Sequence, residues 1–108
     1  MNDNQQALGR IFINGGAMSG DQHLADVIME RARRFGLAGA TVLRGQNGFG
    51  RKHRTGDAGR FDLSETKPVV IELVDAEDRL RSFLEDLSDL KPNLITMERA
   101  EVIFRHPG

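Results

Sequence analysis

The chain has 108 residues, which is the usual size of a single domain. Its formal net charge of −1, with 39% hydrophobic and 29% charged residues, is typical of a globular protein and provides no bulk attraction to nucleic acid or to an anionic membrane. The absence of cysteine excludes a disulfide framework, a thiolate zinc site and a cysteine nucleophile. A polar N-terminus and the lack of any apolar run of about 18 residues predict a cytoplasmic protein without a signal peptide or membrane span.

The first elements expected along the chain are a strand and a helix. Residues 10–13 form a short β-branched and aromatic run that ends in the turn sequence of residues 14–16. Apolar residues then recur at helical spacing over residues 24–35, which predicts a helix. Asp21 is expected to cap this helix, and Gly36 is expected to end it in the left-handed conformation.

The next region contains two strands separated by a long polar segment. Residues 40–44 and 69–74 read as strands, the second entered from Pro68. Between them, residues 46–66 are rich in glycine and charge and show no helical or alternating pattern. Structureless segments longer than about 12–15 residues are uncommon and are usually functional or disordered, so this segment is a candidate for function. Residues 1–8 are expected to be flexible.

A second helix and a last strand complete the chain. Asp75 is expected to cap the helix, whose apolar face carries Leu80, Phe83, Leu84 and Leu87. A turn at residues 91–93 leads into an interrupted strand over residues 94–105.

The order strand, helix, strand, strand, helix, strand predicts one fold over residues 1–108. It is an α+β, ferredoxin-like βαββαβ sandwich, in which an antiparallel four-stranded sheet carries both helices on one face. Val70 and Val74 alternate with the inward residues of their strand, so they are expected on the opposite sheet face. A partner subunit is expected to cover that face.

The glycine-rich, basic start of the long segment is the first candidate site. Gly45, Gly48 and Gly50 would let backbone N–H groups approach a phosphate, and residues 51–54 add positive charge. The familiar phosphate-binding fingerprints do not fit, because Arg51 follows Gly50 where a P-loop requires lysine. The spacing therefore leaves two alternatives open, an anion site and a solvated loop with turn glycines. A nucleic-acid site is disfavoured in a protein with so little net positive charge.

No group of residues indicates catalysis or a metal site. The serines lack the context of a nucleophile elbow, and no pair of carboxylates stands out by its surroundings. His23, His53 and His106 do not have the spacing of metal ligands. The sequence thus predicts a protein that is not an enzyme and has no metal site.

Residues 39–50, with the sequence Gly-Ala-Thr-Val-Leu-Arg-Gly-Gln-Asn-Gly-Phe-Gly, resemble the signature of an uncharacterised family of PII-like proteins. Residues 63–64, residues 68–75 and the helix that follows are similar to the same family. The resemblance runs from Gly9 to Val102. Residues 48–51 also resemble the start of the T-loop of PII signalling proteins.

This resemblance implies a homotrimer that binds a small anionic effector in the clefts between subunits. The effector implied is an adenine nucleotide (ATP, ADP, AMP or cyclic AMP), with no required cofactor and no nucleic-acid partner. Residues 46–66 would serve as a T-loop-like segment that regulates a membrane transporter, a channel or an enzyme. The resemblance also implies a set of ligand-binding residues, some of which the glycine-rich sequence indicates independently. They are Arg44, Gly45, Gly48, Phe49, Gly50, Arg51, Lys52, His53, Arg99 and Arg105.

The sequence departs from PII proteins at two points. Residues 89–93 contain one lysine and no glycine where the PII phosphate loop is rich in both, and the chain lacks the tyrosine that some PII proteins modify. Two alternatives stay open: an assembly scaffold with an unoccupied cleft, and a divalent-cation-binding or cation-tolerance protein of the same trimeric fold. The ligands of the cation-binding protein would be His53 and nearby aspartates.

Overall fold

The computed structural model describes residues 5–46 and 67–106. The main elements of this part of the chain are four strands and two helices. In chain order they are β1 (Gln6–Asn14), α1 (Leu24–Phe35), β4 (Ala40–Arg44), β5 (Pro68–Ala76), α2 (Glu77–Glu85) and β6 (Leu94–Ala100). Short elements between them are β2 (Met18–Ser19), β3 (Gln22–His23) and the 3-10 turn η1 (Ser88–Leu90).

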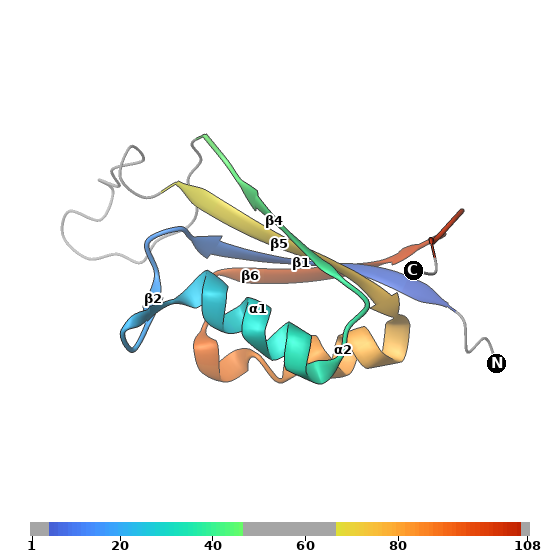
Figure 1. The fold of residues 1–108 in the computed structure, drawn as a ribbon, viewed down its shortest axis with the longest axis horizontal. Coiled ribbons are helices and arrows are strands. Elements are labelled where there is room, and N and C mark those ends of the chain that lie inside the picture. The colour runs from blue at the N-terminus through green and yellow to red at the C-terminus, as the bar shows by residue number, and fades with distance from the viewer. Residues whose placement is uncertain (1–4, 47–66, 107–108) are drawn as a thin grey trace.

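The four longer strands form one antiparallel sheet in the order β4-β5-β1-β6. At its centre, Ile11 of β1 lies opposite Ile71 of β5 and opposite Ile95 of β6. Both helices lie on the same face of the sheet (Figure 1). The ferredoxin-like α+β sandwich predicted from the sequence is therefore confirmed.

The hydrophobic core lies between the sheet and the helices. Every second residue of β1 and β5 is buried, which is the period-two pattern of a strand with one covered face. The helices supply the opposite side of the core from their apolar stripes. The largest fully buried side chains are Ile11, Ile28, Val69, Ile71, Leu73, Leu80 and Leu87.

The other sheet face has no covering element among the described residues. Val70 and Val74 lie on this face, as predicted, and alternate with buried residues of β5. At its centre, Arg10 Nε donates to Glu72 Oε2 at 2.9 Å, and Arg10 Nη1 lies 3.7 Å from Glu98 Oε1. This open face thus consists of apolar residues around a small charged cluster.

The ends of the elements differ from the sequence prediction in several places. Gly36 does end α1 with a φ of 86°, as expected. The N-cap residue of α1, however, is His23 and not Asp21. Asp21 belongs to the turn of a small β2–β3 hairpin that the sequence did not indicate. β1 begins at Gln6, so residues 6–8 belong to the sheet and not to a flexible N-terminus.

Asp75 also has a role different from the predicted helix cap. β5 continues to Ala76, which precedes α2 without a side-chain cap. Asp75 is consequently an inward-facing strand residue, and its carboxylate accepts hydrogen bonds from the N–H groups of Ala38 and Ala76. The last strand is also shorter than the predicted range of residues 94–105. β6 ends at Ala100, and residues 101–106 form no strand. No helix in the described ranges is long and apolar enough to cross a membrane.

Candidate functional site

The first part of the candidate site is the base of segment 46–66, where β4 ends and β5 begins. The Gly45 N–H donates to the Pro68 carbonyl at 2.8 Å, and the Gly15 N–H donates to the Lys67 carbonyl at 2.9 Å. A Cβ on Gly45 would lie 2.8 Å from Pro68 Cγ, and one on Gly15 would collide with the Lys67 carbonyl oxygen. Glycine is therefore favoured at both positions, at Gly15 by the close approach of the Lys67 backbone and at Gly45 by the ring of Pro68.

Two cations flank this base. Arg44 is exposed at the end of β4, and Lys67 is exposed just before β5. Neither forms an ion pair with another residue in the ranges 5–46 and 67–106. As far as the described residues go, both are available to an anion, since a guanidinium or ammonium group without a partner gains most from a phosphate or carboxylate.

The second part of the candidate site lies at the far end of the sheet. Arg99 Nε lies 3.7 Å from Glu77 Oε1, and the Arg99 side chain is 75% exposed. Arg105 Nη2 donates to Gln6 Oε1 at 3.4 Å. Gln6 pairs with Ala100 in the sheet, so both arginines belong to this one corner of the molecule. Exposed pairs of this kind hold a side chain weakly, and they leave both arginines free to rearrange toward a ligand.

The register of the sheet keeps these two parts apart within one chain. Arg44 lies opposite Val69, which lies opposite Ile13, whereas Arg99 lies opposite Ala7. Ile13 and Ala7 are about 20 Å apart along β1, and β4 and β6 are about 14 Å apart across the sheet. Arg44 and Arg99 of the same chain therefore cannot contact one phosphate group.

The remaining candidate residues lie outside the described part of the chain. They are Gly48, Phe49, Gly50, Arg51, Lys52 and His53. Within the described part of the chain, no three His, Asp or Glu side chains gather as a metal site would require. No observation there favours the cation-binding alternative.

Most of the chain matches one protein family. The model of the family DUF190, described as "Uncharacterized ACR, COG1993", matches residues 6–102. The chain belongs to the DUF190 family. Two UPF0166 proteins of Aquifex aeolicus (strain VF5) are 39% identical over 77 residues and 36% identical over 85 residues. The first match covers 71% of this chain and 73% of the relative, and the second covers 78% and 88%.

Solved structures share the fold of this DUF190 chain. A PII-like signalling protein of Thermus thermophilus matches with a TM-score of 0.61 and 17% identity, over 95% of this chain and 94% of that one. CPII of Thiomonas intermedia K12, bound to ADP, AMP and acetate, matches with a TM-score of 0.66 and 13% identity, over 94% and 92%. The same protein bound to ADP and bicarbonate matches with a TM-score of 0.64 and 14% identity, over 91% and 88%. The PII-like resemblance of the sequence is thereby confirmed.

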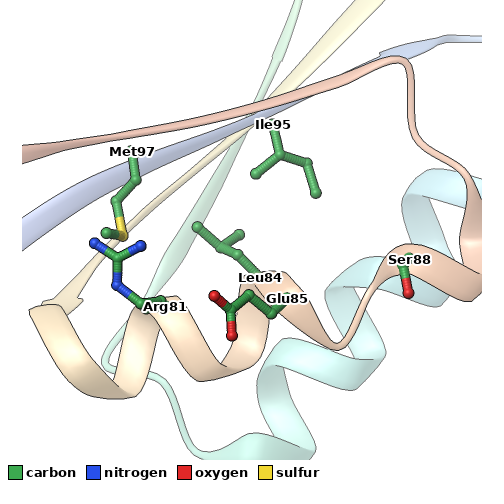
Figure 2. A pocket seen from close by; sticks show the side chains of 6 residues that line it. All are labelled: Arg81, Leu84, Glu85, Ser88, Ile95 and Met97. Atoms are coloured by element: carbon green, nitrogen blue, oxygen red, sulfur yellow. The ribbon is translucent and has the colours of Figure 1, made fainter.

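The DUF190 chain also has a groove that the sequence did not indicate. It lies between α2 and the edge strand β6 and has a volume of about 460 Å³. Figure 2 shows Leu84 pointing from α2 toward Ile95, with Met97 beside Arg81. The complete lining is Arg81, Leu84, Glu85, Ser88, Ile95 and Met97. The only sequence signal was the alternation of Ile95 and Met97, which identifies a strand face but not the space beside it.

A polar cluster positions β4, and with it Arg44. Burial alone would raise the pKa of Asp75, but hydrogen bonds from the N–H groups of Ala38 and Ala76, and then from Arg79, outweigh burial and lower that pKa below its usual value. Arg79 also donates to the Gly36 carbonyl at 2.8 Å. The ionised Asp75 therefore holds the connection between α1 and β4 from inside the fold.

Proposed function

We propose that this DUF190 protein is a PII-like regulator that assembles as a homotrimer and binds an adenine nucleotide in the clefts between subunits. It carries out no reaction of its own and acts in the cytoplasm. The shared fold with CPII supports the nucleotide, because the solved structures of CPII hold ADP, in one case together with AMP. The low identity to CPII means that this chain must supply its own contacts.

The separation of the two arginine groups is the observation on which this proposal rests. Arg44 and Lys67 lie at one end of the sheet, and Arg99 and Arg105 lie at the opposite corner. A ring of subunits joined head to tail would bring one end of a subunit to the other end of the next. In such a ring, each cleft would contain Arg44 from one subunit and Arg99 from its neighbour. Charges that are distant in one chain would then bind the same phosphate chain.

The open sheet face supports the assembly. Leu8, Phe12, Val70 and Val74 are only partly covered in one chain, and Leu94 is 53% exposed. Burying apolar surface of this kind contributes about 25 cal/mol per Å². Subunit contacts on this face would also add to the stability of a small domain, which buries a limited fraction of its own surface.

Segment 46–66 would couple the nucleotide to a target. It is joined to the body at Gly45, next to the cleft cation Arg44, and at Lys67, which is itself a proposed cleft cation. A charge contact at its base would bias its conformation, which is a common way for a ligand to switch a binding loop. We propose a membrane transporter, a channel or an enzyme as that target.

A thermal-shift screen of the full chain against ATP, ADP, AMP and cyclic AMP, with and without Mg²⁺, tests the proposal. A ligand at about 100 times its Kd adds roughly 2.7 kcal/mol, which raises the Tm by several degrees. Arg44→Ala and Arg99→Ala should each weaken the selected nucleotide by roughly 10-fold or more, because charged hydrogen bonds contribute about 1.5–3 kcal/mol. Arg34→Ala is the control, since Arg34 is exposed on α1 and pairs only with Glu30 in the described chain.

The screen has two contrary outcomes. The absence of a shift with every nucleotide would overturn the proposed ligand. A shift with a divalent metal alone would favour the cation-binding alternative.

A further inference from the structure

The end of the chain exposes a run of apolar side chains. Residues 101–106 continue from β6 without forming a strand. Within them, Val102 is 38% exposed, Ile103 is 83% exposed and Phe104 is 78% exposed. Contiguous apolar side chains exposed to this degree mark a surface that another apolar surface covers.

A matching apolar surface lies along the edge of the same sheet. β6 pairs only with β1 among the described strands, so the N–H and C=O groups of its outer edge are available to another strand. Beside that edge, the groove of about 460 Å³ has an apolar floor of Leu84, Ile95 and Met97. An edge strand next to an apolar groove is the usual acceptor for an added extended segment.

We propose that residues 101–105 of one copy add as a strand to β6 of a neighbouring copy and seat Ile103 in its α2–β6 groove. This inference rests on the proposed homo-oligomer and identifies one of its subunit contacts. Backbone hydrogen bonds to the edge of β6 would hold the segment, and the contact of Ile103 with Ile95 and Met97 would set its register.

The alternation of side chains places the other two apolar residues as well. In an extended segment, Val102 and Phe104 point away from the side on which Ile103 lies. On β6, Leu94 and Thr96 face away from the groove in the same manner, because they pair with open-face residues of β1. Val102 and Phe104 would therefore lie beside Leu94, which is 53% exposed in a single chain. Both faces of the added strand would thus be covered.

The charges at the groove and in the segment are complementary. Arg81 and Glu85 of α2 line the groove together with Leu84, and Arg81 Nη2 lies 3.7 Å from Glu77 Oε2 of its own chain. Glu101 and Arg105 stand on either side of Ile103, and in an extended segment they share its face. One direction of the added strand places Glu101 toward Arg81 and Arg105 toward Glu85. The reverse direction places like charges together, so the pairs select a single orientation.

The segment does not fit the groove of its own chain. To return along β6 it would have to reverse within residues 100–103, whose sequence Ala-Glu-Val-Ile contains no Gly, Asn, Asp or Pro to make a tight turn. Figure 1 shows the last coloured part of the chain at the end of the sheet, on the side away from the helices. The occupant of the groove is therefore the segment of a second copy.

Disulfide trapping between chains tests this contact, and the absence of native cysteine makes it free of background. Chains with Met97→Cys and chains with Ile103→Cys are co-expressed with different tags and oxidised mildly. A disulfide forms only when the two Cβ atoms come within about 4.5 Å, so cross-linking of the two different tags is the expected result. Met18→Cys, paired with Ile103→Cys, is the control, because Met18 is 51% exposed on β2 and away from the groove.

A charge reversal supplies a second measurement. Arg81→Glu should lower the Tm of the assembly, and adding Glu101→Arg should restore most of the loss. Circular dichroism of each variant verifies that it is folded.

The outcomes separate this inference from the proposed function. If the wild type assembles but the Met97→Cys and Ile103→Cys chains give no cross-link between the two tags, the inference alone is overturned. Cross-linking between tags without a nucleotide shift supports the inference and overturns the proposed ligand. A monomeric wild type in light scattering overturns both.

Discussion

The carboxylate of Asp75, near the end of β5, accepts a hydrogen bond from the guanidinium of Arg79 in the first turn of α2, with Nε 3.2 Å from Oδ1. Together they connect three elements. Asp75 accepts the Ala38 N–H at 2.9 Å, while Arg79 donates to the Gly36 carbonyl and lies 5.2 Å from the ring centre of Phe35. The start of α2 thereby fixes the connection from α1 into β4, the strand that carries Arg44.

Replacing this carboxylate should destabilise the fold. In Asp75→Asn, the amide can accept fewer of the existing hydrogen bonds, and the side chain is only 12% exposed. The expected loss is about 1–3 kcal/mol of unfolding free energy, the usual cost of an unsatisfied buried polar group. Urea denaturation measures it. Asp26→Asn is the matched control, because Asp26 is exposed in the first turn of α1, and an equal loss in both variants would contradict the assignment.

The same carboxylate predicts a pH dependence of stability. Because folding lowers the pKa of Asp75, the folded state favours the ionised form, and the stabilisation is complete above the unfolded pKa of about 3.9. It is lost as the pH falls through the lower, folded pKa. The difference in unfolding free energy between wild type and Asp75→Asn should therefore shrink below about pH 4. A difference that stays constant from pH 7 to pH 3 would contradict this.

The base of segment 46–66 predicts a steric effect of a single methyl group. Gly15→Ala places a Cβ against the Lys67 carbonyl oxygen, which belongs to the backbone and cannot move aside as a flexible side chain would. The expected loss is about 1–3 kcal/mol, as for overpacking in general. Gly39→Ala is the control, since a Cβ there meets no atom within 4 Å and its φ is not in the left-handed region. Equal unfolding free energies for the two variants would be the contrary result.

The charged cluster on the open sheet face predicts a test of assembly. Arg10→Glu would place three carboxylates together, with those of Glu72 and Glu98, and burying them at a subunit contact is costly. The variant should shift the assembly toward monomers in multi-angle light scattering. Adding Glu72→Arg should recover assembly, because it restores an opposite pair at the same register position.

The control for this change is Arg34→Glu, which alters an exposed residue of α1 by the same two charges. If Arg34→Glu dissociates the assembly as strongly as Arg10→Glu, the open face is not the contact.

The fold was predictable because its signals are local and repeated. The alternation of Val69, Ile71 and Leu73 with Val70 identified both the strand and its buried face, and Gly36 marked the end of a helix. The caps were not predictable in this way. Asp75 has the sequence context of a cap, but β5 extends through Ala76. The Asp75 side chain therefore points into the core, where Ala38 and Arg79 are its partners.

The site was less predictable than the fold because it depends on register and on space between elements. Arg44 and Arg99 both lie on strands that the sequence identified, but only the pairing of β4, β5, β1 and β6 places them at opposite corners. The α2–β6 groove likewise depends on how far the helix stands from the edge strand. Neither property leaves a periodic signal in the sequence.

The separation of Arg44 and Arg99 predicts complementation between chains. If each cleft takes Arg44 from one subunit and Arg99 from the next, then neither Arg44→Ala nor Arg99→Ala alone forms an intact cleft. After unfolding and joint refolding of equal amounts, random mixing should give about a quarter of the clefts both arginines, because each is contributed with even odds. Titration calorimetry of the mixture should then recover tight nucleotide binding at about that fraction of sites.

The double variant Arg44→Ala/Arg99→Ala, mixed with Arg34→Ala chains, serves as the comparison. It also forms about a quarter of intact clefts, since a cleft between two Arg34→Ala subunits retains both arginines. Recovery in this comparison but not in the mixture of single variants would mean that both arginines act within one subunit, which the sheet register does not permit for a single phosphate group. Recovery in both mixtures would locate the nucleotide between subunits.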